Sequence, residues 1–281
     1  MPTKVASAKP TFLGGVFGSL TTLYDKRWLI KYLAQRQWAV RFQGSHLGMF
    51  WAFMSPLLNV AMLSLIFSKV LGIKFREVTG DPTLNFGLFL YCGQIPFMAF
   101  SDALNQGVTV IRKNSSLVRG VVFPLEILPP TAIIASLIQA VFGVAALMTI
   151  LLVVAERAHL TVLLLPLILV PQLLFTVGLS YLMAVVGTYL PDIRETLRAF
   201  VRVIYFITPI LWPTGRLPEK WSFIIDYNPL AFLVNSYRAL ILEGDVPSLQ
   251  AGINFSLFAT GVFVVGLACF NRVKRNFADL L

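Results

Sequence analysis

The stretch ILPPTAIIASLIQAVFGVAALMTILLVVA, residues Ile127–Ala155, contains no Asp, Glu, Lys or Arg. As an α-helix it would be about 43 Å long at about 1.5 Å per residue, whereas the hydrocarbon core of a bilayer is about 30 Å thick. Because a helix satisfies its own backbone polar groups without water, it is the natural structure for such a stretch in lipid. Four other charge-free stretches of at least 20 residues are Phe42–Ser68, Pro82–Ser101, Ala158–Pro191 and Val246–Asn271. The sequence therefore predicts an all-α polytopic membrane protein.

The overall composition argues against a soluble enzyme. Hydrophobic residues make up 57% of the 281 residues and charged residues only 13%, compared with about 25% charged residues in average soluble domains. Spans and connections use most of the chain, which leaves no room for a soluble catalytic domain of about 100 residues. The net charge of +10 lies in short connections between apolar runs, where it sets membrane topology. We therefore expect no nucleic-acid partner.

A coarse reading gives six crossings, at roughly 47–70, 86–107, 129–154, 162–190, 195–212 and 251–270. The fifth is the weakest, because Arg198 and Arg202 must snorkel to the headgroups at its start. With the N-terminus in the cytoplasm, 16 of the 23 Lys and Arg residues fall on the cytoplasmic side. This excess favours both termini in the cytoplasm.

Residues 1–46 form the predicted cytoplasmic N-terminal region, and residues 47–281 form the membrane domain. Tyr24–Phe42 is too polar to span but reads as an amphipathic helix. Arg36 interrupts its apolar side and Trp38 its polar side. Such a helix lies in the headgroup plane, either as a simple anchor or as a lever that also touches a cytoplasmic partner. The apolar side carries Trp28, Leu29, Tyr32, Leu33 and Val40, and the polar side Lys26, Arg27, Lys31, Gln37 and Arg41.

The segment Ile224–Leu242, IIDYNPLAFLVNSYRALIL, is long enough to be a seventh span. However, Asp226–Pro229 breaks it near its start and Arg238 lies near its end. We therefore expect a re-entrant hairpin that enters from the outer face before the last span, where protein buries it or it lines a cavity. The alternative is an interfacial helix that lies flat on the outer leaflet.

The loop between the second and third spans has the features of a docking surface. It begins with basic residues and then presents apolar residues around a proline. Exposed apolar side chains in a short loop indicate a protein contact, although the alternative is that 121–125 dips into the membrane interface. The predicted contact residues are Val122, Phe123, Pro124, Leu125 and Glu126.

Together these features resemble the transmembrane subunit of ABC-2-type ABC transporters, in the branch that exports O-antigen, capsule and teichoic-acid polymers. The resemblance rests on the order and spacing of short motifs from about residue 20 to the end, none of them specific alone. They are His46-Leu47-Gly48 with Trp51 and Pro56, Val122-Phe123-Pro124 with Pro129, Tyr205–Leu211, Leu217-Pro218-Glu219, Tyr227-Asn228-Pro229-Leu230 and the basic tail Asn271–Phe277.

The resemblance implies an interface helix, a coupling helix after the second of six spans, and re-entrant helices before the sixth. It also implies a homodimer in the bacterial inner membrane, bound to two copies of a separate ATPase that carries ATP and Mg. The sequence contains no G-x-x-x-x-G-K-[ST] phosphate-binding loop. We therefore expect no catalytic residue, metal or cofactor on this chain, and we expect export of a lipid-linked, O-antigen-like polysaccharide.

Aromatic residues beside the irregular segments are the predicted lining of the translocation path, because aromatic rings stack on sugar rings without fixing a register. Charged residues at membrane depth are further candidates. Asp102 and Arg238 are the clearest, each with the alternative of a position near the headgroups. The predicted gate residues are Trp51, Phe53, Tyr205, Phe206, Trp212, Tyr227, Asn228 and Pro229, and Arg36, Arg41 and Arg202 are predicted to receive a lipid-linked pyrophosphate.

Three alternatives remain open. An ABC-2 exporter of drugs or lipids is the nearest. A secondary carrier would need internal repeats or ionisable residues at the bilayer midplane, and the sequence shows no repeat. A membrane-embedded transferase would need clustered carboxylates or a metal motif, but Asp192 and Glu195 are the only close acidic pair in a predicted cytoplasmic loop. Cys92 and Cys269 lie in apolar runs without the spacing of a metal site.

Overall fold

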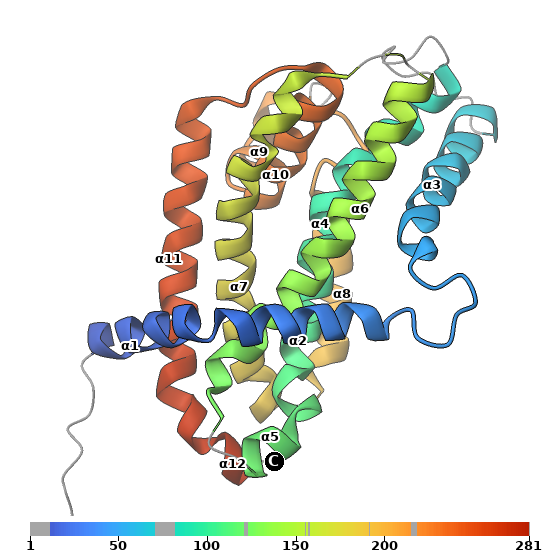
Figure 1. Ribbon diagram of the computed structural model, residues 1–281. Helices are drawn as coiled ribbons and strands as arrows, with labels where there is room; N and C mark the ends of the chain where they lie inside the picture. Colours follow the sequence, from blue (N-terminus) through green and yellow to red (C-terminus); the bar gives the residue numbers. More distant parts are fainter. Residues whose placement is uncertain are drawn as a thin grey trace, which may run out of the picture.

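The computed structural model describes residues 12–70, 82–120, 123–154, 156, 158–190, 192–214 and 218–280, and every regular element within these ranges is helical (Figure 1). The prediction of an all-α fold is therefore confirmed. The helices of the bundle are α3 (Phe50–Ser64) with the π turn η1 (Leu65–Val70), α4 (Pro82–Lys113), α6 (Leu128–Val154), α7 (Leu165–Tyr189), α8 (Ile193–Ile207) and α11 (Leu249–Val273). The others are α1 (Phe12–Asp25), α2 (Arg27–Val40), α5 (Ser115–Gly120), η2 (Leu125–Ile127), η3 (Leu160–Leu164), η5 (Glu219–Trp221), α9 (Phe223–Asp226), α10 (Pro229–Arg238), η6 (Ala239–Glu243), η7 (Lys274–Asn276) and α12 (Phe277–Leu280).

Four helical segments are long and apolar enough to cross a membrane, and they coincide with the first, third, fourth and sixth predicted spans. They are Phe50–Phe67, Leu125–Val153, Leu160–Tyr189 and Leu249–Asn276. α4 and α8 occupy the positions of the second and fifth predicted spans. α8 is only 15 residues long and exposes three basic side chains, Arg194, Arg198 and Arg202. The shortness of α8 and these exposed basic residues explain why the fifth span is the weakest of the six predicted spans.

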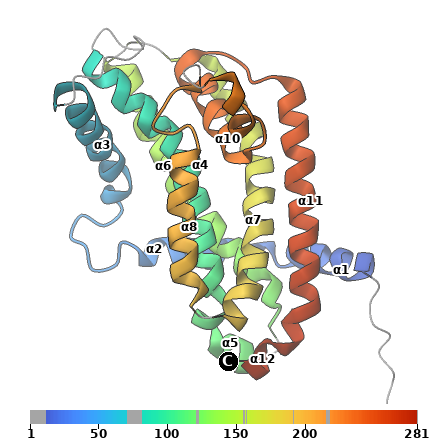
Figure 2. The same ribbon diagram turned by 180° about the vertical axis from the view of Figure 1, so that it is seen from behind.

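Helices α7 and α11 pack side by side along much of their length (Figures 1 and 2). Two glycines make this approach possible. A Cβ added at Gly178 would lie 2.6 Å from the Cα of Phe263, and one added at Gly266 would overlap the carbonyl oxygen of Gly178. Small residues of this kind let helix backbones approach closely inside a membrane.

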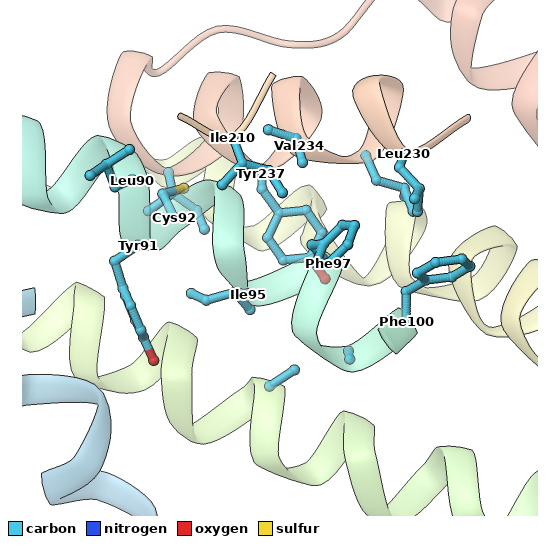
Figure 3. Packing of buried hydrophobic residues seen from close by; sticks show 14 of the residues in the cluster. Leu90, Tyr91, Cys92, Ile95, Phe97, Phe100, Ile210, Leu230, Val234 and Tyr237 are labelled. Atoms are coloured by element: carbon cyan, nitrogen blue, oxygen red, sulfur yellow. The ribbon is translucent and has the colours of Figure 1, made fainter. Parts of the chain in front are cut away.

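The centre of the core lies where α4 packs against α10 (Figure 3). α10 is surrounded by protein, since Leu233, Val234 and Tyr237 are fully buried. The segment predicted as a hairpin or a flat interfacial helix therefore folds as two short helices, α9 and α10, of which α10 is part of the core. The packed side chains include Leu90, Cys92, Ile95, Phe97 and Phe100 of α4, Leu230, Val234 and Tyr237 of α10, and Ile210.

The N-terminal helices α1 and α2 cross the bundle at a steep angle near its α5 end (Figure 1). The predicted amphipathic helix is present, but its protein-facing side is Ile30, Ala34 and Trp38. Trp38 was assigned to the polar side, and this was wrong, because its ring stacks on Phe142 of α6 at 5.3 Å between centroids. The aromatic rings of the predicted apolar side, Trp28 and Tyr32, are exposed instead, as suits a surface that meets lipid.

Candidate functional site

Candidate functional residues gather at the two ends of the bundle. The α5 end, lower in Figure 1, contains the loop between α4 and α6. α4 is fixed there by Arg112, whose guanidinium donates to the carbonyl oxygens of Gly187 at 3.1 Å and Thr188 at 2.9 Å, both on α7. The short helix α5 follows directly. Ser116 and Arg119 on α5 are exposed, whereas Leu117 and Val118 pack against the core.

The predicted docking residues of this loop are less exposed than a free loop would be. Phe123 and Leu125 pack, half-buried, against a core cluster, and Pro124 is half-buried between them. Val122 lies outside the described residues. The exposed surface at this end therefore belongs to α5 more than to the apolar motif that follows it.

Glu126 is buried and has a partner within the same chain. Lys274 Nζ lies 3.0 Å from Glu126 Oε2, and the Tyr181 hydroxyl donates to the Glu126 carbonyl oxygen at 2.6 Å. A buried carboxylate must be paired, because desolvating a lone charge is expensive. The carboxylate that the sequence placed on a docking surface is thus held by the C-terminal tail, and sequence reasoning missed its partner.

The α10 end, upper in Figure 1, contains the Tyr227-Asn228-Pro229 motif. Asn228 caps α10 by accepting from the Leu230 N–H at 3.0 Å, and its amide donates to the Thr208 hydroxyl at 3.1 Å. Pro229 occupies the first turn of the helix, where its missing N–H has no cost. Tyr227 is 87% exposed. The motif therefore starts α10 and ties it to the end of α8.

Arg238 has the most buried guanidinium-bearing side chain described, at 4% exposure. It donates to the carbonyl oxygens of Pro209 at 2.6 Å and Ile210 at 2.7 Å, and to that of Phe89 at 3.3 Å. Its guanidinium also lies 3.5 Å from the centroid of the Phe89 ring. The alternative that Arg238 snorkels to the outer headgroups is wrong. Its side chain joins α10, α4 and the chain that follows α8.

The aromatic candidates fall into two groups. Tyr205 and Phe206 are neighbours on α8, and the Tyr205 hydroxyl accepts from the Gln94 amide at 2.9 Å. Trp212 lies near them, since its indole N–H donates to the Phe206 carbonyl oxygen at 3.2 Å. Trp51 and Phe53 lie on α3, a different helix, which packs on α4 and α6. The structure thus groups these three aromatics at the end of α8, where Thr208 accepts a hydrogen bond from Asn228, and leaves the α3 pair separate.

A cavity of about 840 Å³ lies against α9, α10 and η6. Its wall includes Asp226, Asn235, Arg238, Glu243 and His159. Ligand cavities in proteins commonly measure about 300–1,000 Å³. The irregular segment between α8 and α11 therefore lines a cavity whose wall carries both apolar and polar side chains.

A second cavity, of about 620 Å³, lies between α2, α4 and α6. Three basic side chains line it: Arg36, Arg41 and Lys113. Its acidic lining residue, Asp102, lies 3.4 Å from Arg41, and the Asp102 side chain is 54% exposed. Arg36 and Arg41 thus line one cavity, whereas Arg202 is exposed on α8 and does not line it. A role of these three residues in receiving a lipid-linked pyrophosphate stays a prediction.

Within the described ranges, no group of three or more His, Cys, Asp or Glu side chains could hold a metal ion. Cys92 is buried and Cys269 is half-buried. The residues brought together are instead apolar, hydroxyl, amide and basic groups at the ends of apolar helices. This arrangement defines a helical membrane protein with a cavity near each end of the bundle.

The class can be narrowed by comparison with known proteins. The chain belongs to the ABC-2 type transporter family, whose model matches residues 28–242. It is 27% identical to the O-antigen export system permease protein RfbA of Klebsiella pneumoniae over 94% of this chain and 97% of that protein. It is 25% identical to the Myxococcus xanthus RfbA, over 92% and 96% of the two chains. It is also 28% identical to the polysialic acid transport protein KpsM of Escherichia coli, over 86% and 92%.

Proposed function

We propose that this chain is the channel-forming subunit of an ATP-driven exporter that moves a lipid-linked surface polysaccharide across the bacterial inner membrane. The observation that carries this proposal is the near full-length similarity to permeases named for O-antigen export and polysialic acid transport. Similarity over single motifs would support only a fold. Similarity over 94% of the chain covers the loop, the hairpin and both cavities.

The energy for export would come from a separate subunit. The sequence contains no phosphate-binding loop of the G-x-x-x-x-G-K-[ST] type. The proposed assembly is a homodimer of this chain with two copies of an ATPase, which carries the ATP and Mg. Family membership supports the ATPase partner, and the homodimer is proposed because the resemblance of the sequence motifs to this family implies one.

The proposed topology has six spans with both termini in the cytoplasm. Its spans are α3 with η1, α4, α6, α7, α8 and α11. Basic residues at the α5 end support this orientation, because Lys and Arg are enriched in cytoplasmic loops. Exposed residues of that end are Arg112, Lys113, Arg119, Arg194 and Arg272.

Coupling to the ATPase is proposed to occur at α5 and the segment that follows it. α5 supplies exposed polar residues, while Phe123, Pro124 and Leu125 connect it to the core. Val122 belongs to the same proposed segment. An ATPase that pulls or pushes α5 would thus act on α4 and α6, which flank the loop.

The gate is proposed to be the re-entrant segment α9–α10 with the α8 aromatics. Hydrogen bonds from Asn228 to Thr208 and from Arg238 to Pro209 and Ile210 support this, because they link the hairpin to the end of α8. Tyr205, Phe206, Trp212 and Tyr227 would offer rings to passing sugars, and Trp51 and Phe53 would do so from α3.

The lipid-linked pyrophosphate is proposed to be received by Arg36 and Arg41 at the cavity between α2, α4 and α6. Phosphate groups are bound well by guanidinium groups, whose planar fork matches their oxygens. Arg202, on α8, would contribute only at a separate position.

Deletion of the gene tests this function. The deletion strain should lose its surface polysaccharide and accumulate the lipid-linked polymer in the inner membrane, and a plasmid copy should restore export. An unchanged surface polysaccharide, with altered drug resistance or lipid composition instead, would favour an exporter of drugs or lipids.

A further inference from the structure

The last turn of α11 joins three segments that are distant in sequence. Asn271 accepts a hydrogen bond from the Ser19 hydroxyl at 2.9 Å and donates to the Gly15 carbonyl oxygen at 3.1 Å, both on α1. One turn later, Lys274 pairs with Glu126 at 3.0 Å. The end of α11 therefore contacts the first N-terminal helix, α1, and the loop before α6.

The tail beyond Lys274 is anchored by one aromatic ring. Phe277 is fully buried, and its ring lies 5.4 Å from that of Phe270 in an edge-on arrangement. The same cluster receives Leu117 and Val118 of α5. α12 also contacts α5 directly, at the lower end of the bundle (Figure 1). The docking helix and the C-terminal tail thus share one apolar cluster.

The ion pair between Glu126 and Lys274 makes the contact between the loop and the end of α11 specific. The Glu126 side chain is 9% exposed and the Lys274 side chain 26% exposed. A buried ion pair adds little net stability, but the removal of one partner leaves a costly unpaired charge. The pair therefore fixes the position of the loop relative to α11 more than it stabilises the fold.

We propose that the C-terminal segment Lys274–Leu280 is a clasp that sets the position of α5 and so transmits partner movement to α11. Lys274 and Glu126 are its positioning residues, and Phe277 is its anchor. A displacement of the loop must either carry the tail with it or break the ion pair. Because Asn271 also holds α1, the same movement reaches the N-terminal helix α1. This inference rests on the proposed function, since it takes the partner of α5 to be the ATPase.

The test compares Glu126→Gln, Lys274→Met and the charge swap Glu126→Lys with Lys274→Glu, each expressed with the ATPase. Arg275→Met, at the exposed neighbouring position, is the matched control. Both single variants should retain ATPase co-purification and ATP hydrolysis while export falls about fivefold or more, as expected for loss of a coupling contact. The swap should recover much of the export, and the control should behave as wild type.

Wild-type export in both single variants, or a swap no better than either, would overturn the clasp. If Glu126→Gln does not accumulate in the membrane, Lys274→Met decides, because that side chain is partly exposed. A wild-type chain that captures no ATPase would refute the proposed function, and this result is separate from any difference among the variants.

Discussion

The guanidinium of Arg238 lies 3.5 Å from the centroid of the Phe89 ring, and the two residues are 149 positions apart in the sequence. The cation is enclosed by this ring, by the Phe89 carbonyl oxygen within α4, and by the carbonyl oxygens of Pro209 and Ile210, which follow α8. A cation over an aromatic face contributes about 2 kcal/mol when it is desolvated. The contact therefore fixes the end of α10 to α4 and to the chain that follows α8.

Arg238→Lys should destabilise the protein although it keeps the charge. A lysine ammonium is compact and cannot replace the planar fork that reaches the carbonyl oxygens of Pro209 and Ile210 together. We expect a loss of roughly 2–4 kcal/mol, as for other buried polar partners left unpaired. Thermal unfolding of the detergent-purified protein measures this, with Arg202→Lys on exposed α8 as the control. Equal melting temperatures for both variants would contradict a stabilising role of the Arg238 guanidinium.

Gly266→Ala should disrupt the contact between α7 and α11. The added Cβ would overlap the Gly178 carbonyl oxygen, so that the helices must separate at a cost of about 1–3 kcal/mol. Gly261→Ala is the matched control on the same helix, because nothing lies within 4 Å of its added Cβ. Thermal unfolding of both variants gives the comparison. If Gly266→Ala is as stable as Gly261→Ala, the close approach is not present in the membrane.

The proposed topology predicts the labelling of single cysteines in a variant that lacks Cys92 and Cys269. Ser115→Cys and Asn276→Cys should react only when a membrane-impermeant thiol reagent reaches the cytoplasm. Glu219→Cys should react from outside, as should Lys74→Cys, whose position lies outside the described residues. Labelling of Asn276→Cys from outside would contradict the six-span topology.

Ser116→Trp should block ATPase docking while the fold remains intact, because Ser116 is exposed on α5. A bulky indole at a contact prevents close approach, and a tenfold loss of affinity corresponds to about 1.4 kcal/mol. Phe123→Asp is a less specific test, since Phe123 packs against the core of its own subunit. Co-purification of the ATPase measures docking, and Ser222→Trp at the other end of the bundle is the control. Equal ATPase recovery from both variants would exclude α5 as the docking helix.

Sequence patterns predicted the parts of this structure that depend on neighbouring residues. Long apolar runs predicted the helical spans, and Asn228-Pro229 predicted the break that begins α10. Arg36 and Arg41 line one cavity because both lie on or directly after α2, and their role in binding a pyrophosphate stays a prediction.

Contacts between distant segments could not be predicted in this way. Trp38 was assigned to the polar side by helical periodicity, but the position of Phe142 decided its environment. Likewise, Glu126 has an acidic side chain suited to a docking surface, and only the fold shows that Lys274 neutralises it. Arg238 was recognised as unusual, whereas the carbonyl oxygens that bind it come from segments brought together by tertiary packing.

The central claim is ATP-driven export, and transport into inverted membrane vesicles tests it most directly. Vesicles that contain this chain and its ATPase are supplied with the lipid-linked polysaccharide, and its protection from an added glycosidase is followed. We predict protection that requires ATP, the ATPase and this chain together, and that persists after the proton gradient is collapsed. Protection driven by an ion gradient without ATP, or no protection in the complete system, would contradict the account.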